Sequence, residues 1–141
     1  MIAIACDHAG IDLKPTVISV LDELGIPYKD FGTHKRESCD YPIYAARAAK
    51  AVADGECDRG ILICGTGIGI SIAANKVQGI RAAVVTNEFM AEMCKAHNDA
   101  NIISFGGRVI TIEEAIRFTD IWLDTETEMG RHAERRAMTE A

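Results

Sequence analysis

The fold of this chain is constrained most by the stretch from Gly60 to Ser71, which has the pattern of a strand, a loop and a helix in succession. Residues 61–63 form an unbroken apolar run with two β-branched side chains, which is typical of a parallel strand buried on both faces. The run ends at Cys64, and three glycines alternate along the next five residues. Residues 70–76, rich in Ala and Ile, then indicate a helix. The stretch therefore predicts one strand–loop–helix unit of an α/β fold.

The glycine loop combines two chemical properties. Glycine allows a tight turn and a close approach of the backbone to a ligand, and the N–H groups at a helix start are unsatisfied and electropositive. A thiol there is easier to ionise, because the positive helix end favours the thiolate. Cys64 and the loop therefore offer a potential base beside an anion-binding site. The alternative is a buried strand-end cysteine followed by a simple turn, since free Cys is among the most buried residue types.

Three familiar ligand-binding loops do not match this stretch. The dinucleotide fingerprint G-x-G-x-x-G requires a glycine where the chain has Ile70, and a cysteine phosphatase loop requires an arginine there. The ATP/GTP loop needs a Gly-Lys pair, which occurs nowhere in the chain. Glu88 lies about one βα unit further on and could imitate the acid that binds a ribose, so a nucleotide-binding regulatory module stays open as an alternative.

Composition narrows the class of protein. The chain has 141 residues, of which 48% are apolar and 26% are charged, so we expect one globular domain covering residues 1–141. The net charge of −6 argues against a nucleic-acid partner, and no apolar run approaches a membrane span. The N-terminal segment lacks the basic region of a signal peptide. Five cysteines without a C-x-x-C pair argue against a disulfide framework or a structural zinc site, and they favour the cytoplasm.

Strand and helix patterns alternate along the whole chain. Strands are predicted at residues 1–6, 28–31, 61–63, 80–85 and 101–105. Helices are predicted at residues 13–24, 43–53, 70–76, 88–96 and 111–123, followed by a tail helix within residues 129–141. Thr111 is a suitable N-cap for the helix that follows it, and we expect Trp122 to pack in the core.

This alternation predicts a doubly wound, Rossmann-like domain, with a five-stranded parallel sheet of order 2-1-3-4-5 and helices on both faces. In such sheets the ligand crevice lies at the carboxyl ends of strands 1 and 3, where the winding reverses. The first strand ends at Asp7 and His8, and the third ends at Cys64. Two separate groups of reactive side chains thus fall at the expected crevice, which favours a functional role for Cys64.

Several motifs of the chain resemble those of ribose-5-phosphate isomerase type B, whose superfamily includes allose-6-phosphate and galactose-6-phosphate isomerases. The resemblance covers essentially the whole chain. Its motifs are Cys6-Asp7-His8-Ala9-Gly10, Gly32-Thr33, Asp40-Tyr41-Pro42, Ile63 to Lys76, Gly79-Ile80-Arg81-Ala82, His97-Asn98-Asp99-Ala100-Asn101 and Gly130-Arg131-His132.

The resemblance implies an aldose–ketose isomerase that uses no cofactor and no metal. It implies that Cys64 is the general base between C1 and C2 of the sugar, and that His97 helps to open the sugar ring. Asp7 would bind or relay protons at the ring hydroxyls, and Asn98 would bind substrate. The pocket for the enediolate oxygen is implied to consist of Gly65, Thr66, Gly67, Ile68 and Gly69. The phosphate grip is implied to consist of His8, Arg108, Arg131 and Arg135.

The implied ligand is a small sugar phosphate, and the implied assembly is a homodimer with shared active sites, with a tetramer left open. Ribose 5-phosphate is the expected substrate, and allose 6-phosphate, galactose 6-phosphate or a tetrose phosphate are the alternatives. Simpler interpretations exist for individual residues. Asp7 would also fit as a cap of the first helix, and His97 as a helix-end residue that complements the helix dipole. Arginines in a polar tail are usually solvated.

Overall fold

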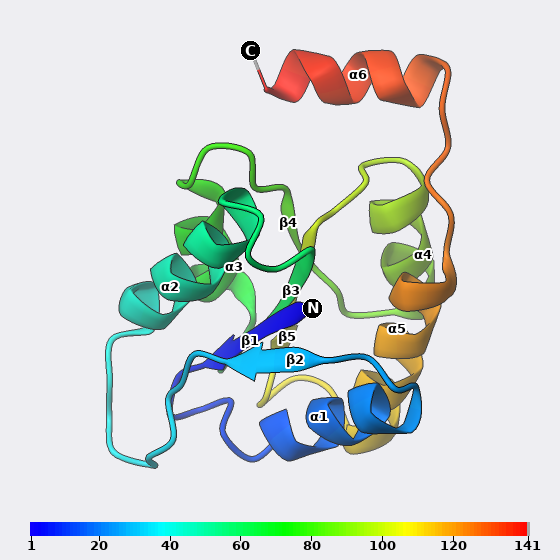
Figure 1. The fold of residues 1–141 in the computed structure, drawn as a ribbon. Helices are drawn as coiled ribbons and strands as arrows, with labels where there is room; N and C mark the ends of the chain where they lie inside the picture. Colours follow the sequence, from blue (N-terminus) through cyan, green and yellow to red (C-terminus); the bar gives the residue numbers. More distant parts are fainter. Residues whose placement is uncertain (141) are drawn as a thin grey trace.

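Five parallel strands form one sheet in the computed structural model, which describes residues 1–140 (Figure 1). The three central strands are buried along almost their whole length, because their side chains are apolar on both faces. The strands are β1 (Ile2–Cys6), β2 (Tyr28–Asp30), β3 (Arg59–Cys64), β4 (Ala82–Val84) and β5 (Ile102–Gly106). Every neighbouring pair is parallel, so the predicted fold class is confirmed.

The predicted strand order is wrong at one edge of the sheet. The observed order is β2-β1-β3-β5-β4, so the last two strands are exchanged relative to the predicted 2-1-3-4-5. An interior strand needs apolar side chains on both faces, and β5 supplies five buried residues, including Ile102, Ile103 and Phe105. The three residues of β4 are only half-buried, which suits a short edge strand.

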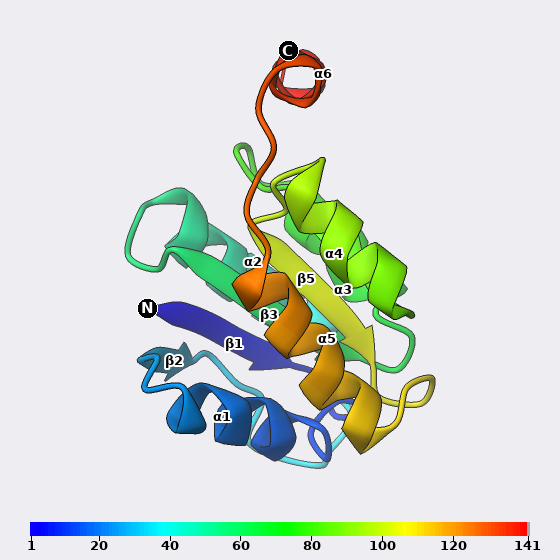
Figure 2. The ribbon, with the colours of Figure 1, turned by 90° about the vertical axis from the view of Figure 1, so that its right-hand side faces the viewer.

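Helices cover both faces of the sheet (Figure 2). The helices are α1 (Lys14–Glu23), α2 (Tyr41–Ala53), α3 (Ile68–Asn75), α4 (Glu88–Ala96), α5 (Ile112–Asp124) and α6 (Arg131–Thr139). One apolar core lies between the sheet and α1, α4 and α5, and a second lies between the sheet and α2 and α3. As predicted, Trp122 is fully buried, and Thr111 caps α5 in a reciprocal capping box with Glu114.

The C-terminal helix α6 stands apart from the two cores (Figures 1 and 2). None of its described residues is buried, and it contacts the rest of the chain through polar groups. Arg136 Nη1 donates to the carbonyl of His97 over 2.8 Å, and Arg81 Nη1 donates to Glu140 over 3.0 Å. Ala141, the last residue of the predicted domain, lies outside the described residues. Within residues 1–140 no helix has the length and apolar character needed to cross a membrane.

Candidate active site

Three loops meet where β1, β3 and β5 end. The amide of Asp7 donates to the carbonyl of Ile63 over 3.1 Å, and the amide of Gly107 donates to the carbonyl of Cys64 over 2.7 Å. The loops pack so closely that a Cβ on Gly107 would lie 2.6 Å from the carbonyl oxygen of Ala9. The carboxyl ends of these strands therefore form one continuous surface, which we call the carboxyl-edge group; its predicted site residues are Asp7, His8, Cys64, residues 65–69 and Arg108.

Cys64 is the last residue of β3, and only 4% of its surface is exposed. The amide of Gly67, the N-cap residue of α3, donates to the Cys64 sulfur over 3.1 Å. Because the start of a helix is electropositive, the sulfur receives its N–H donor at a position that suits a negative charge. The predicted succession of strand, thiol, glycine loop and helix is therefore present.

The loop depends on glycine at position 67. Gly67 has φ +82°, a left-handed conformation that other residues rarely adopt, and a Cβ there would lie 2.9 Å from the carbonyl carbon of Phe105. Ser104 Oγ donates to the Gly67 carbonyl over 2.8 Å. The conformation of the loop is thus stabilised by a hydrogen bond from the neighbouring strand β5 as well as by the left-handed turn at Gly67.

Two of the loop amides already donate hydrogen bonds within the chain. Gly67 donates to the cysteine sulfur, and Ile68 donates to Thr66 Oγ1 over 3.1 Å. The amides of Gly65, Thr66 and Gly69 make no hydrogen bond within residues 1–140, so they remain available for an oxygen of a ligand. Of residues 65–69, which were predicted to form the oxyanion pocket, these three have amides without a hydrogen-bond partner in the described chain.

Asp7 is 6% exposed, and its Oδ1 accepts hydrogen bonds from the amides of Ala9 at 2.9 Å and Gly10 at 3.1 Å. This turn precedes α1, whose N-cap is Leu13 and has no side-chain cap. Asp7 therefore does not cap the first helix. Its second oxygen, Oδ2, makes no hydrogen bond within the described chain.

Two residues near the start of α2 contact the carboxyl-edge group, although no role was predicted for them. The amide of Cys39 donates to His8 Nδ1 over 3.2 Å, which leaves Nε2 of a neutral His8 as the proton donor. Tyr41 lies against the glycine loop, since a Cβ on Gly69 would be 2.9 Å from the tyrosine oxygen. The motif Asp40-Tyr41-Pro42 was the only sequence signal of this contact.

Arg108 follows β5 and lies beside the glycine loop. Its amide donates to the carbonyl of Gly65 over 3.1 Å, and a Cβ on Gly65 would lie 3.4 Å from Arg108 Nη1. The Arg108 side chain is exposed. A forked cationic group is thus available next to the free loop amides, as an anion site requires.

The remaining predicted site residues lie at the opposite edge of the sheet. His97 is the C-cap of α4, and β5 begins five residues later, so His97 lies on the side where the strands start. Cys64 pairs with Gly106 at the other end of β5, and the two ends are about 13 Å apart at the usual rise of a strand. We call His97, Asn98, Arg131 and Arg135 the amino-edge group.

A cavity of about 720 Å³ lies at the amino edge, between α6 and the segment that joins α3 to β4. Its lining includes His97, Asn98 and Arg135. The side chain of Arg135 is exposed, whereas Arg136 is half-buried and bound to the carbonyl of His97. Of these two neighbouring arginines, Arg135 is therefore the one available to a ligand.

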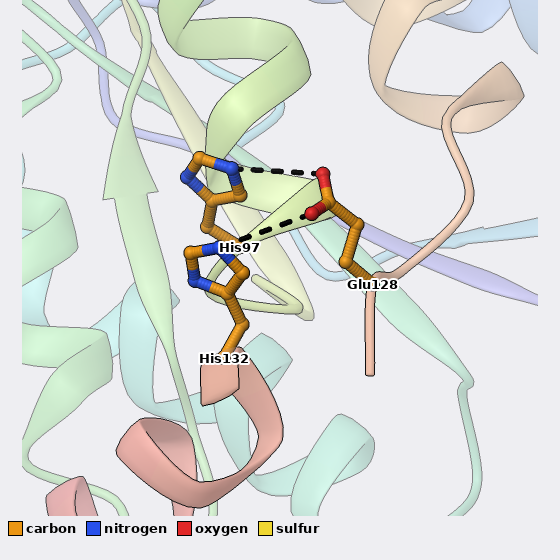
Figure 3. A group of neighbouring side chains, drawn as sticks. All are labelled: His97, Glu128 and His132. Carbon is orange, nitrogen blue, oxygen red and sulfur yellow. Dashed lines mark ion pairs between the residues drawn. The ribbon is translucent and has the colours of Figure 1, made fainter. Parts of the chain in front are cut away.

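One cluster has the residue types of a metal site (Figure 3). The ligand atoms of His97, Glu128 and His132 lie within 4.8 Å of one another. The two imidazole rings, however, are stacked with centroids 3.9 Å apart and planes 6° apart. Their in-plane lone pairs run nearly parallel, so they do not converge on an ion about 2.0–2.1 Å from each nitrogen, as zinc requires. The cluster as arranged is not a tetrahedral zinc site.

The chain is similar to known proteins along almost its whole length. A family model described as Ribose/Galactose Isomerase matches residues 2–139. Ribose-5-phosphate isomerase B of Escherichia coli is 50% identical over 134 residues, which cover 95% of this chain and 90% of that protein. A D-erythrulose-4-phosphate isomerase of Pectobacterium atrosepticum is 44% identical over 133 residues, covering 94% and 88% of the two chains.

A solved structure shows the same arrangement of the backbone. Ribose-5-phosphate isomerase B of Clostridium thermocellum superposes with a TM-score of 0.97 at 52% identity, and the match covers 99% of this chain and 94% of that one. The match includes both the carboxyl-edge and the amino-edge segments. The chain therefore belongs to the ribose/galactose isomerase family.

Proposed function

We propose that the chain is a cofactor-independent aldose–ketose isomerase that interconverts ribose 5-phosphate and ribulose 5-phosphate, with Cys64 as the general base. The observation that supports this most directly is the position of the Cys64 sulfur, 3.1 Å from a loop amide and beside free N–H donors. A thiol base next to preorganised donors is what proton transfer through an enediolate needs.

In this proposal the Cys64 thiolate takes the C2 proton of the open-chain aldose. The electron pair of the C–H bond forms the C1=C2 double bond, and the carbonyl electrons move to O1, where the amides of Gly65, Thr66 and Gly69 stabilise the negative charge. The protonated thiol then returns the proton to C1, and the proton of the C2 hydroxyl passes to O1. Nothing is oxidised or reduced outside the sugar.

We also propose that each active site is shared between two chains. The sheet separates Cys64 from His97 by about the length of β5, which is wider than a five-carbon sugar. Within one chain the base and the ring-opening histidine therefore cannot serve the same substrate. A second chain, related by a two-fold axis, can bring its amino-edge group to the carboxyl-edge group of the first, and the reverse contact then follows by symmetry.

Helix α3 offers a surface for this pairing. It begins at the glycine loop and ends at Asn75, which lines the amino-edge cavity. It therefore runs from the carboxyl-edge group to the amino-edge cavity. Ile68 and Ile72 lie one turn apart on its outer face, and each is 54% exposed. Antiparallel packing of two α3 helices would bury these isoleucines and place each Cys64 beside the other chain's cavity.

The phosphate would then meet cations from both chains. His8 and Arg108 lie at the carboxyl edge, and Arg131 and Arg135 lie one turn apart on α6. Because both arginines of α6 are exposed and α6 stands apart from its own cores, they are free to meet an anion on a neighbouring chain.

The substrate is tested with a panel of ribose 5-phosphate, allose 6-phosphate, galactose 6-phosphate and erythrose 4-phosphate, scored by kcat/KM. We expect ribose 5-phosphate to be preferred. One hydroxymethyl group changes pocket binding by only about 1–3 kcal/mol, so activity on a neighbouring sugar is expected at roughly a tenth to a hundredth of that rate. A tetrose or hexose phosphate at the top of the panel would reassign the substrate, and inactivity on all four would reject the isomerase proposal.

A further inference from the structure

The cluster of His97, Glu128 and His132 has no role in the proposed chemistry except through His97 (Figure 3). The two oxygens of Glu128 face the two imidazoles: Oε2 lies 3.6 Å from His97 Nε2, and Oε1 lies 3.8 Å from His132 Nε2. The rings themselves are stacked 3.9 Å apart. A single carboxylate thus lies beside the stack and faces the Nε2 atom of each of the two parallel rings.

The backbone around the cluster holds this arrangement in place. The amide of Glu128 donates to the carbonyl of Ala96 over 2.8 Å, which ties the carboxylate to the end of α4 beside His97. On the other side, Arg136 Nη1 donates to the carbonyl of His97 over 2.8 Å. The end of α4 is therefore hydrogen-bonded both to the segment between α5 and α6, through Glu128, and to α6 itself, through Arg136.

The imidazole ring of His132 is suited to support the ring of His97 without carrying a charge. Burial and the proximity of His97 lower the pKa of His132 and outweigh the opposing effect of Glu128, which favours the uncharged ring. An uncharged imidazole can stack on His97 without repelling it. The side chain of His132 is 12% exposed, compared with 36% for His97, so His132 forms the inner wall and His97 faces the cavity.

We propose that Glu128 and His132 are positioning residues for His97. Glu128 faces His97 Nε2, so the other ring nitrogen, which points away from Glu128 in Figure 3, is the one that meets the sugar. When this nitrogen takes the proton of the anomeric hydroxyl, the C1–O bond of the ring breaks, its electron pair stays on the ring oxygen, and the proton is then delivered to that oxygen. Glu128 stabilises the imidazolium that exists between these two steps.

The role of His132 is to keep the His97 ring at the angle that this transfer requires. A stacked ring restricts rotation about the last side-chain bond of His97, and a small error in the position of a catalytic group is costly. This inference rests on the proposed function, in which His97 opens the sugar ring. All three side chains belong to one chain, so the inference does not depend on how the two chains associate.

The test compares Glu128→Gln with Glu126→Gln, a matched change in the same segment at an exposed residue that forms no ion pair within residues 1–140. Glu128→Gln should lower kcat on the cyclic sugar phosphate about 10- to 100-fold with KM changed less than about twofold. Exchange of the C2 proton from an open-chain substrate should be unchanged. Glu126→Gln should behave as wild type. Equal losses in both assays, or no loss, would overturn the role of Glu128.

The stack is tested by His132→Phe and His132→Ala. Phenylalanine keeps a neutral ring against His97, so kcat on the cyclic substrate should stay within about threefold of wild type, whereas alanine should lose about as much as Glu128→Gln. If His132→Phe is as poor as His132→Ala, stacking is not the function of this ring. Activity that falls when wild type is treated with a chelator would instead indicate a bound metal.

Proton NMR gives a readout that does not require isomerase activity. The chain has four histidines, so the signal of the His97 ring can be assigned by its loss in His97→Ala. We expect an upfield shift from the stack, which Glu128→Gln changes and Glu126→Gln does not. Unchanged His97 signals in Glu128→Gln would overturn the contact. If wild type isomerises no sugar phosphate, the proposed function falls, while this spectrum still tests the cluster.

Discussion

The five cysteines of this chain lie in different surroundings, and none is paired in a disulfide. Burial raises the pKa of Cys6 and of Cys94 to about 11, so both remain thiols at neutral pH. Cys64 is also buried, but a loop amide donates to its sulfur and the loop around it carries free N–H donors. Residue type alone therefore does not distinguish the candidate base; its position at the end of β3 does.

Cys64→Ser should lower kcat at least about a hundredfold, because it keeps the shape of the side chain but replaces the thiol by a much weaker acid. Steady-state kinetics on ribose 5-phosphate measures the loss. Cys57→Ser is the matched control, since Cys57 is 1% exposed but precedes β3 at the opposite edge of the sheet. Near-normal kcat in Cys64→Ser would remove this residue from the mechanism.

Alkylation distinguishes Cys64 from the buried cysteines Cys6 and Cys94. Iodoacetamide should modify Cys64 faster at pH 8 than at pH 6, and a bound sugar phosphate should protect it, because the thiolate is the reactive form and the substrate would cover it. Cys6 and Cys94 should be labelled far less at both values, since burial raises the pKa of each thiol to about 11 and keeps the thiolate rare. Peptide mass spectrometry counts the labels; equal labelling of Cys64 with and without substrate contradicts its placement in the site.

At the scale of single elements, the turn after α4 positions His97 and Asn98. Its third residue, Asp99, has φ +46°, a conformation that Asp and Asn adopt more readily than most residues. Asp99 Oδ1 accepts hydrogen bonds from Lys95 at 2.9 Å and from Thr127 at 2.8 Å. The same carboxylate thus ties the end of α4 to the segment that leads into α6.

Asp99→Asn should destabilise the protein by about 1 kcal/mol at pH 7, a value reduced because the Asp99 side chain is 40% exposed. Burial acts to raise the pKa of Asp99, but hydrogen bonds from Lys95 and Thr127 and the charges of Lys95 and Arg81 outweigh it, so the pKa lies below its ordinary value. The stabilisation is therefore present above about pH 3.9 and is lost as the pH falls further.

Urea unfolding of wild type and Asp99→Asn between pH 7 and pH 3 measures this difference in free energy. The two proteins should converge at the acid end. A difference that stays constant over the whole range would show that the charge of Asp99 makes no contribution. The asparagine variant keeps the backbone conformation accessible, so a local refolding of the turn is not expected to dominate.

At the scale of the whole molecule, the predicted site residues are divided between two edges of one sheet. The carboxyl-edge group contains the proposed base and the loop amides, and the amino-edge group contains His97 and the arginines of α6. This division follows directly from parallel strands: residues that follow a strand and residues that precede one lie on opposite sides of the sheet. In the proposed dimer, each carboxyl-edge group would meet the amino-edge group of the other chain.

Mixed refolding tests the shared site. Cys64→Ser and Arg131→Ala are each expected to be inactive, and they are unfolded and refolded together. In a mixed dimer one site then carries both defects and the other carries neither. Random pairing makes about half of the dimers mixed, so roughly a quarter of all sites should be intact. If Arg131 served its own chain's Cys64, every site would keep one defect; a mixture that stays inactive while refolded wild type recovers would reject the shared site.

Local patterns were sufficient to predict most elements of the fold. The apolar runs at β1, β3 and β5, the Thr111 cap of α5 and the glycine loop at α3 each depend on side chains within a few residues of one another. Burial on both faces, capping and positive φ are properties of short segments, so they can be recognised in the sequence. The α/β class followed from the regular alternation of these segments.

Only the tertiary structure decided which strands are neighbours and which candidate residues meet. The places of β4 and β5 depend on which of two distant segments is more apolar, and that comparison favours β5 for the interior. Tyr41 contacts Gly69 although the two residues are far apart in the chain. His97 and Cys64 lie at opposite ends of β5, which no local pattern around either residue indicates. Such relations arise from the packing of whole elements, and no short segment of the sequence contains them.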